Sequence, residues 1–423
     1  MKQYQKNALA LCSLGIGNGR TKVPVFTDDS EWTELIRFST DQNLLPLIFD
    51  TASKYGLMTS GKSAELKDAC TSAVQRAIRQ IIQTNEFLTL LLHAQEKGLD
   101  PIVIKGVVCR DLYPQPCLRP SVDEDILVPV DDTERYHEFL LAEGLFADEA
   151  ELTADERKKK YELSYHKENS PTYIELHKNL FDPDSKIFGN LNDLFEGMTE
   201  RTIHIQVEDV SVRTLAPTDH LLYLILHAYK HFLHSGAGIR PICDIGLFAD
   251  RYAEKIDWRE IREKLLSVNA FCYAKALFRI IQLYLLPEAG FFTQVEDWNI
   301  EKIDVDPLLK DSLASGVHGA SSMTRLHSSN MTLHAAGMRG RKGGIFQAVR
   351  HSIFLPLGEL RNHYIYLKRN PFLLPVAWVH RVVRYIMETR NKDILLETDN
   401  SVSGSIRLGR ERIRLLRKYK IIE

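Results

Sequence analysis

The sequence DEDILV at residues 123–128 joins an acidic start to a continuous apolar end. A short apolar run of this kind is typical of a buried strand. Side chains two positions apart lie on the same face of a strand, so Asp123 and Asp125 should project together while Glu124 faces away. We expect Glu124 to lie near an exposed end of the strand, because a charge on the back face of a core strand is costly elsewhere.

Asp123 and Asp125 form a candidate site for a divalent metal ion. Two carboxylates held side by side repel each other unless a cation lies between them. Mg²⁺ prefers carboxylate oxygens and often bridges them to substrate phosphates, and Mn²⁺ accepts the same ligands. The simpler alternative is a strand that begins with solvent-exposed acids, since acidic side chains are mostly exposed.

Two flanking motifs favour the metal site. Lys105-Gly106 follows the β-branched run at 101–104 and opens a helix. A glycine there lets the backbone approach a phosphate, and a helix N-terminus favours anions. Downstream, Glu175 and His177 share one face of a strand, so Glu175 can supply a third carboxylate beside the pair. Three carboxylates on adjacent strands with a glycine turn describe a two-metal phosphoryl-transfer site.

In their order along the chain, these motifs resemble the signature of the uncharacterised bacterial nucleotidyltransferase-like proteins of the polymerase-beta-type nucleotidyltransferase superfamily. The resemblance covers residues 30–290. It rests on Lys105-Gly106, Leu112-Tyr113, Arg119-Pro120-Ser121, the acidic strand at 123–128, Glu175-Leu176-His177, the helical stretch at 227–231, Asp244-Ile245 and the stretch at 256–258. Many superfamily members place a Gly-Ser pair before the two acids, where this chain has Lys105-Gly106.

The resemblance implies an activity and roles for three acids. The activity is transfer of a nucleoside monophosphate from an NTP donor to an acceptor, with Mg²⁺ or Mn²⁺ as the cofactor. Asp123 and Asp125 would bind the metal ion that is bridged to the triphosphate. Glu175 would be the third metal ligand, or the base that activates the acceptor hydroxyl.

Four further residues are candidate nucleotide contacts: Lys105, Gly106, Arg119 and His177. Lys105 and Arg119 would neutralise phosphate charge, and a guanidinium is suited to bidentate contact. Each residue also has a structural alternative. Lys105 would then end its strand in solvent, Arg119 would pair with an acid in its loop, and His177 would be a hydrogen-bonded structural histidine.

Composition and periodicity together predict an α+β fold. With 44% apolar and 26% charged residues, the 423-residue chain is typical of soluble globular protein, which excludes a mainly disordered or collagen-like chain. We expect a small mixed-sheet nucleotidyltransferase core flanked by N- and C-terminal helical regions. The predicted segments are an N-terminal helical region at 1–100, the α/β core at 101–215, a helical domain at 216–338 and a basic helical extension at 339–423.

Local patterns predict the main elements of the core and its neighbours. An apolar helical pattern runs over 64–97 and stops at Gly98, as a helix-ending glycine should. We expect strands at 101–104, 123–130, 161–166 and 172–177, a hairpin at 202–215, and helices at 107–113, 133–143 and from 217 through 286.

Charge is distributed unevenly along the chain. Residues 339–423 contain 18 Lys or Arg and 7 Asp or Glu, whereas residues 1–338 contain 36 and 49. This asymmetry predicts an anionic partner for the basic extension, or docking of the extension on the body. The segment at 406–422 would be a basic amphipathic helix for a membrane surface, a phosphate-binding segment for nucleic acid or a solvated face. Two further apolar-basic segments lie at 345–355 and 371–387.

Other features argue against common alternatives. The six cysteines form no C-x-x-C pair, so we expect a reducing cytoplasm rather than a disulfide framework or a zinc ribbon. No apolar stretch reaches the roughly 18 residues that a membrane span needs, and the short apolar run at 8–16 lacks a signal-cleavage motif. His227 and His231 have helical metal-ligand spacing but no third ligand, so we expect them to line the cleft or pack against Asp244.

The leading hypothesis is an Mg²⁺-dependent nucleotidyltransferase that uses an NTP donor and acts on a sugar, a phosphorylated metabolite or a protein hydroxyl. The second is a non-catalytic descendant that binds nucleotide or a partner, and the third is a membrane-surface adaptor that uses the basic extension. Asp123, Asp125 and Glu175 together favour the enzyme, because a binding scaffold has no need of a costly acidic triad.

Overall fold

The chain divides into two compact units, one comprising Met1–His227 and Ile239–Val305, the other Ala228–Gly238 and Asp306–Glu423. The predicted apolar-basic segment at 345–355 and the end of the one at 371–387 lie outside the residues that the structure describes. The computed structural model describes residues 1–26, 29–58, 63–316, 370–380 and 402–422, together with Thr332, Leu333, Ala336, Leu360, Tyr364, Tyr366, Leu367 and Val383.

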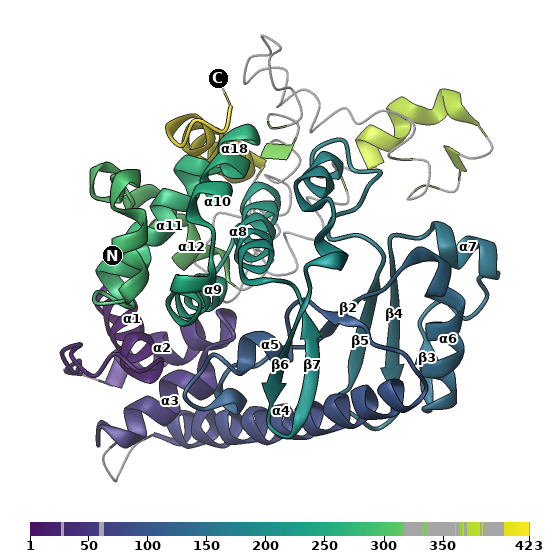
Figure 1. The fold of residues 1–423 in the computed structure, drawn as a ribbon. Helices are drawn as coiled ribbons and strands as arrows, with labels where there is room; N and C mark the ends of the chain where they lie inside the picture. Colours follow the sequence, from purple (N-terminus) through teal and green to yellow (C-terminus); the bar gives the residue numbers. More distant parts are fainter. Residues whose placement is uncertain are drawn as a thin grey trace. The chain divides into compact units, whose positions relative to one another are not determined.

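Helices surround a seven-stranded sheet in the first unit (Figure 1). The strands are β1 (Ile102–Val103), β2 (Glu124–Leu127), β3 (Leu145–Ala147), β4 (Glu162–Lys167), β5 (Tyr173–His177), β6 (Ile203–Val207) and β7 (Val210–Thr214). The helices are α1 (Gln3–Gly15), α2 (Asp29–Asp41), α3 (Leu45–Lys54), α4 (Ala64–Glu96), α5 (Val107–Arg110), α6 (Thr133–Ala142), α7 (Ala154–Lys159), α8 (Pro217–His234), α9 (Ile239–Arg251), α10 (Trp258–Ser267) and α11 (Phe271–Tyr284). The last residues of α8, from Ala228 on, belong to the second unit.

The sheet is mixed and has the strand order β3-β4-β5-β2-β1-β7-β6. The β2–β5 and β1–β7 pairs are parallel, and the other neighbours are antiparallel. Parallel pairing of β2 with β5 places Asp125 opposite Glu175 and Leu127 opposite His177. This α+β architecture with a mixed sheet and flanking helices is the predicted fold class, which is therefore confirmed.

One face of the sheet carries the hydrophobic core. Alternation along β2, β4 and β5 turns apolar side chains such as Ile126, Tyr165 and Leu176 toward this face, where they pack with Phe87 of α4 and Leu140 of α6. Figure 1 shows α4 running along the sheet as its longest neighbouring helix. The intervening side chains of the same strands are mainly polar and point to the opposite face, which is where the predicted site residues lie.

Most of the predicted elements of the first unit are confirmed. The helix expected over 64–97 is α4, which begins after the Ser63 cap and is followed by Gly98 at φ +68°. The predicted strand at 123–130 is shorter, because β2 ends at Leu127 and Pro129 follows. The short strand β3 was not predicted, since its few residues carry no clear alternation.

The apolar run at 8–16 forms part of α1. Ala8, Leu11 and Cys12 have no solvent exposure, so this run belongs to the core of the first unit. The signal-like pattern therefore has a folding explanation, namely the packing of α1 on α2 and α3.

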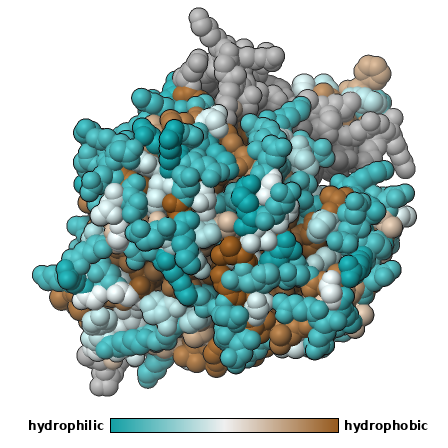
Figure 2. Space-filling model, in the orientation of Figure 1, coloured by the Kyte–Doolittle hydropathy of each residue, from teal (hydrophilic) through white to brown (hydrophobic). Residues whose placement is uncertain are grey.

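One stripe of α4 is apolar and exposed. Val74, Ile78, Ile81 and Ile82 recur at helical spacing and are 59%, 51%, 47% and 44% exposed. Figure 2 shows apolar patches at the lower edge of the view, where α4 runs in Figure 1. The opposite stripe of α4 is the one that packs on the sheet, so the helix is apolar on two sides.

The described part of the second unit includes α12 (Asp306–Ser315), a short 3₁₀ turn (Pro371–Leu373) and α18 (Val402–Lys418). Arg412 is buried and donates hydrogen bonds to the carbonyls of Phe232 and His234. Ile413 and Leu416 are buried too, whereas the remaining basic side chains of the helix that are described are exposed. The apolar side chains Ile413 and Leu416 of this basic helix are thus covered in the folded chain. Within the residues the structure describes, no helix has the length and apolarity needed to cross a bilayer.

Candidate active site

Glu124 is fully buried, so the prediction that it lies near an exposed strand end is wrong. It forms an ion pair with Arg110 of α5, and neither side chain has solvent exposure. Its carboxylate also accepts hydrogen bonds from the Val107 amide (2.9 Å) and from Gln83 Nε2 (3.2 Å). A buried charge is tolerated when it is paired and fully hydrogen-bonded, and these partners make the back face of β2 acceptable to a carboxylate.

Gly106 allows the chain to turn tightly against Glu124. Its backbone lies at φ +51° and ψ −117°, a region that favours glycine, and a Cβ there would overlap Glu124 Oε2. The first free amide of α5, that of Val107, is donated to the same carboxylate. The anion at this helix start is therefore Glu124 itself, and contact of Gly106 with a phosphate stays a prediction.

Asp125 points to the opposite face of β2, where Lys105 and His177 both contact its Oδ1 atom. Lys105 Nζ lies 3.0 Å and His177 Nε2 lies 3.1 Å from Asp125 Oδ1. Lys105 Nζ also lies 3.3 Å from Nε2 of His227 on α8. The Asp125 side chain is 2% exposed and the Lys105 side chain 17%. Lys105 therefore does not end its strand in solvent but serves as a counterion to Asp125.

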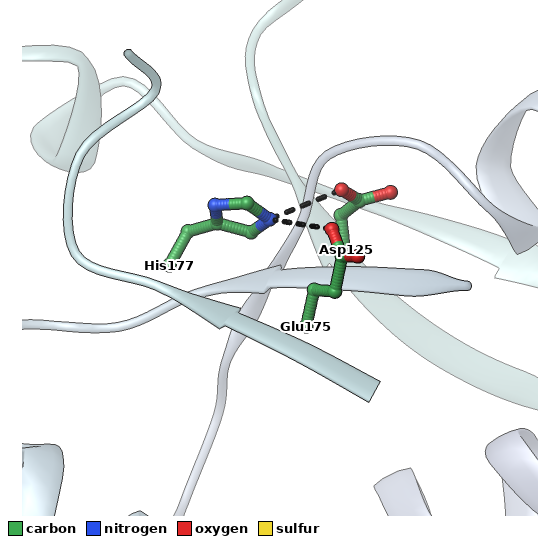
Figure 3. A group of neighbouring side chains, drawn as sticks. All are labelled: Asp125, Glu175 and His177. Carbon is green, nitrogen blue, oxygen red and sulfur yellow. Dashed lines mark hydrogen bonds and ion pairs between the residues drawn. The ribbon is translucent and has the colours of Figure 1, made fainter. Parts of the chain in front are cut away.

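Glu175 and His177 of β5 complete a compact group with Asp125 (Figure 3). His177 Nε2 lies 3.5 Å from Glu175 Oε2, in addition to its contact with Asp125. One ligand atom from each of the three residues falls within 4.8 Å of the others. The register of β2 and β5 produces this arrangement, because Asp125 and Glu175 are direct neighbours and His177 follows two positions along the same face.

Close contact among these charges shifts their pKa values. Burial alone would raise the pKa of Asp125, but Lys105 and His177 bring it below its usual range. Burial alone would lower the pKa of His177, but its hydrogen bonds to Asp125 and Glu175 raise it to about 9. The Asp125 carboxylate likewise holds the pKa of Lys105 well above its ordinary value, against the lowering effect of burial. At neutral pH the group thus contains an ionised Asp125 beside two cations.

Asp123 lies one residue before β2 and is half-buried. In the described part of this unit, the clustered potential metal ligands are Asp125, Glu175 and His177. The structure therefore brings together two of the three predicted carboxylates, Asp125 and Glu175, with His177. Asp123 remains a predicted metal ligand.

Arg119 is committed to a buried ion pair. Its Nε and Nη2 atoms each donate a 2.7 Å hydrogen bond to a different oxygen of Asp244 on α9. The Tyr113 hydroxyl donates to Asp244 as well, at 2.8 Å. The structural alternative for Arg119 was thus correct in kind, but the acid lies 125 residues away rather than in the same loop. Asp244 is thus bonded to Arg119 and Tyr113, and the expectation that His227 and His231 line the cleft or pack against Asp244 stays a prediction.

One oxygen of the site has no partner within the described chain. Asp125 Oδ2 is buried and accepts no hydrogen bond from any described residue, and Figure 3 shows it directed away from the imidazole. Buried carboxylate oxygens are almost always hydrogen-bonded or ligated. The Asp125 carboxylate with its unpartnered oxygen, the carboxylate of Glu175 and the imidazole of His177 together fit a divalent cation.

Sequence reasoning missed two residues of β4 and its approach. Glu162 lies opposite His177 in the antiparallel β4–β5 pair, and its Oε2 is 3.6 Å from His177 Nδ1. The ring of Tyr161 packs edge-on against the imidazole at 5.5 Å. The alternation predicted for 161–166 contained the signal, since it placed every second side chain of β4 on the same face as His177.

The mixed sheet, its flanking helices and the buried acidic group at β2 and β5 define a protein of the nucleotidyltransferase type. A family model described as an uncharacterised nucleotidyltransferase matches residues 28–285. The chain therefore belongs to this uncharacterised nucleotidyltransferase family, and the predicted resemblance is confirmed. No curated protein and no solved structure matches the chain significantly.

Proposed function

We propose that the chain moves a nucleoside monophosphate from an NTP to a hydroxyl or phosphate acceptor, with Mg²⁺ or Mn²⁺ as the cofactor. The observation that carries this proposal is the pairing of Asp125 with Glu175 across adjacent parallel strands, with one buried Asp125 oxygen lacking a partner among the described residues. Membership of a nucleotidyltransferase family supports the donor class. The acceptor is proposed only as a sugar, a metabolite or a protein.

The proposed reaction is an in-line displacement at the α-phosphorus. An acceptor oxygen forms a bond to this phosphorus while the bond to the bridging oxygen of pyrophosphate breaks, and pyrophosphate leaves with that electron pair. When bound, a divalent ion neutralises the triphosphate and stabilises the charge that develops on the leaving group. The proton of an acceptor hydroxyl passes to a carboxylate of the enzyme.

Each residue of the group has a proposed task. Asp123, Asp125 and Glu175 would hold the ion through carboxylate oxygens. The Glu175 side chain is 22% exposed, so a second oxygen can also accept the acceptor's proton. Lys105, already placed against Asp125, would contact the phosphates through its ammonium group. Arg119 would hold the loop before β2 through Asp244 rather than contact the nucleotide.

Calorimetry with each of the four NTPs in the presence of Mg²⁺ tests this proposal. We expect one or more NTPs to bind the wild type, and Asp125→Asn to weaken that binding at least about tenfold, or about 1.4 kcal/mol. Asp148→Asn is the matched control, because Asp148 is an acid of the same unit that is 38% exposed and bonds His166. Pyrophosphate release with candidate acceptors then identifies the second substrate.

Two results would contradict the enzyme. If the wild type binds no NTP with Mg²⁺ or Mn²⁺, the group at β2 and β5 is a relic in a non-catalytic scaffold. If Asp125→Asn binds NTP as tightly as the Asp148→Asn control, the nucleotide lies elsewhere.

The exposed arginines of α18 support a separate, smaller proposal. We infer that residues 339–423 contact an anionic surface through side chains such as Arg410, Arg414 and Arg417, since the apolar face of this helix is covered. Pelleting with anionic and with neutral vesicles tests it. Equal pelleting of the wild type and of Arg410→Glu/Arg414→Glu/Arg417→Glu would contradict the contact.

A further inference from the structure

We propose that His177 is itself a metal ligand, and that Asp125, Glu175 and His177 hold a first-row transition-metal ion in preference to Mg²⁺. This deepens the proposed function and rests on it for the reaction, although binding of the ion can be measured without nucleotide. The family likeness points to carboxylates alone, whereas the geometry places an imidazole nitrogen among them.

The spacing of the donor atoms suits direct coordination. His177 Nε2 lies 3.1 Å from Asp125 Oδ1 and 3.5 Å from Glu175 Oε2. Two neighbouring ligands of a six-coordinate ion with bonds near 2.1 Å are about 3 Å apart. The three side chains therefore already lie close to the separations that ligands of one ion adopt.

The backbone holds this group in place. Asp125 and Glu175 are paired residues of adjacent strands, and His177 is two positions beyond Glu175 on the same face. The ring of Tyr161 limits rotation of the imidazole from the side. Sites built on strands keep their geometry better than sites built on loops, so an ion would meet a preformed donor set.

The unpartnered oxygen of Asp125 gives an independent reason for a cation here. Asp125 is 1% exposed, yet its Oδ2 has no hydrogen-bond partner among the described residues. A buried carboxylate oxygen without a partner is costly. A divalent ion bound by the Asp125 carboxylate would remove that cost, and a bound Lys105 ammonium on Oδ1 does not.

The nitrogen donor decides which ion is preferred. Mg²⁺ is a hard ion that strongly prefers oxygen ligands. Imidazole suits first-row transition metals, and Mn²⁺ accepts carboxylate and imidazole together. A set of two carboxylates and one imidazole should therefore favour Mn²⁺ or a later first-row ion over Mg²⁺, while three carboxylates should not.

The test is binding of Mn²⁺ to the metal-free full-length protein without nucleotide. Calorimetry measures the affinity, and pulsed electron paramagnetic resonance detects the nuclei next to the bound ion. We expect the bound Mn²⁺ to show coupling to a ¹⁴N nucleus of imidazole. His177→Gln should abolish that coupling and weaken Mn²⁺ binding at least about tenfold, within the range by which loss of a metal-site partner acts. His177→Asp should retain binding but lose the preference for Mn²⁺ over Mg²⁺.

His166→Gln is the matched control. His166 lies on β4 of the same sheet, is bonded to Asp148 and is 48% exposed, so this variant should keep both the ¹⁴N coupling and the Mn²⁺ affinity. Mn²⁺ that binds the wild type without ¹⁴N coupling, or that binds His177→Gln as tightly as His166→Gln, would overturn the inference. Nitrogen-coupled Mn²⁺ in a protein that binds no NTP would uphold the inference while contradicting the proposed function.

Discussion

Glu124 and Asp125 are neighbours in β2, yet their carboxylates have opposite environments. Glu124 has partners for both oxygens: Arg110 and Gln83 on Oε1, and the Val107 amide on Oε2. Asp125 has two cations on Oδ1, while its buried Oδ2 has no partner among the described residues. The described chain supplies hydrogen-bond partners to both oxygens of Glu124 but to only one oxygen of Asp125.

This difference separates a structural charge from one that is ready to bind. Alternation along a strand puts successive side chains on opposite faces, so an acidic triplet necessarily sends charge both into the core and toward the site. On the core face, full hydrogen bonding makes the charge tolerable. On the site face, the unsatisfied oxygen leaves room for a ligand that the folded chain does not provide.

Neutralising Glu124 and Asp125 separately should give the largest difference in stability between the two carboxylates. Glu124→Gln leaves the Arg110 guanidinium buried without a counter-charge, which should lower the free energy of unfolding by about 3–5 kcal/mol. Asp125→Asn should cost less than about 1.5 kcal/mol, because Lys105 is partly exposed and His177 can release its proton once the carboxylate is gone. Urea unfolding at pH 7.5 measures both values.

Binding provides the converse readout for the same two variants. When both variants are folded, in the absence of denaturant, Glu124→Gln should still bind Mn²⁺ and Asp125→Asn should not. Equal losses of stability in the two variants would show that Asp125 is as structural as Glu124, and the contrast drawn here would be wrong.

The sequence was sufficient to predict the strands and the faces of the site. Alternation assigned Asp125 and Glu175 to site-facing positions, and the parallel register of β2 and β5 then joined them. Helix α4 and the glycine that follows it could also be predicted, because a long apolar period and a helix stop are local signals.

The partners of the buried charges could not be predicted, because they depend on tertiary contacts. Arg110 lies 14 residues and Gln83 lies 41 residues before Glu124, and nothing local links them. The approach of His177 to Asp125 depends on which strands pair and in which register. Alternation specifies the face of each side chain but does not specify its neighbour on the next strand.

Gly106→Ala tests the close approach that completes the Glu124 network. A methyl group would overlap the Glu124 carboxylate at a backbone conformation that strains alanine, so we expect a loss of about 2–3 kcal/mol in unfolding free energy. Gly144→Ala is the matched control, because Gly144 also has positive φ (+81°) but has open space around it. Its loss should be about 1 kcal/mol, and an equal loss in both variants would remove Glu124 from the explanation.

Two buried histidines sharpen the contrast through pH. His177 lies among carboxylates that raise its pKa to about 9, whereas burial lowers the pKa of His220 to about 4. His220 is therefore neutral in the folded chain and charged in the unfolded chain below about pH 6.5. Its contribution to stability is complete above pH 6.5 and falls as the pH drops toward 4, by about 2 kcal/mol between pH 7.5 and pH 5.

The His220→Gln variant isolates this term. The stability advantage of the wild type over His220→Gln should shrink by about 2 kcal/mol when urea unfolding is measured at pH 5 instead of pH 7.5. His177 acts in the opposite direction, since its stabilisation is complete below pH 6.5 and is lost as the pH rises through 9. An advantage that does not vary with pH would mean that His220 takes up a proton at pH 5 as readily in the folded chain as in the unfolded chain.

Arg119 offers the smallest and most specific test, because it asks whether a second buried carboxylate is structural in the way that Glu124 is. Lysine cannot reproduce the two parallel hydrogen bonds to Asp244, so Arg119→Lys should cost about 1–2 kcal/mol of unfolding free energy. Arg251→Lys, at an arginine that is 48% exposed, should cost less than about 0.5 kcal/mol. NTP affinity should stay within about twofold of wild type in both variants, since less than about 0.4 kcal/mol separates such affinities. If folded Arg119→Lys binds NTP more weakly and Arg251→Lys does not, the Arg119 guanidinium contacts the nucleotide, as the family resemblance implies.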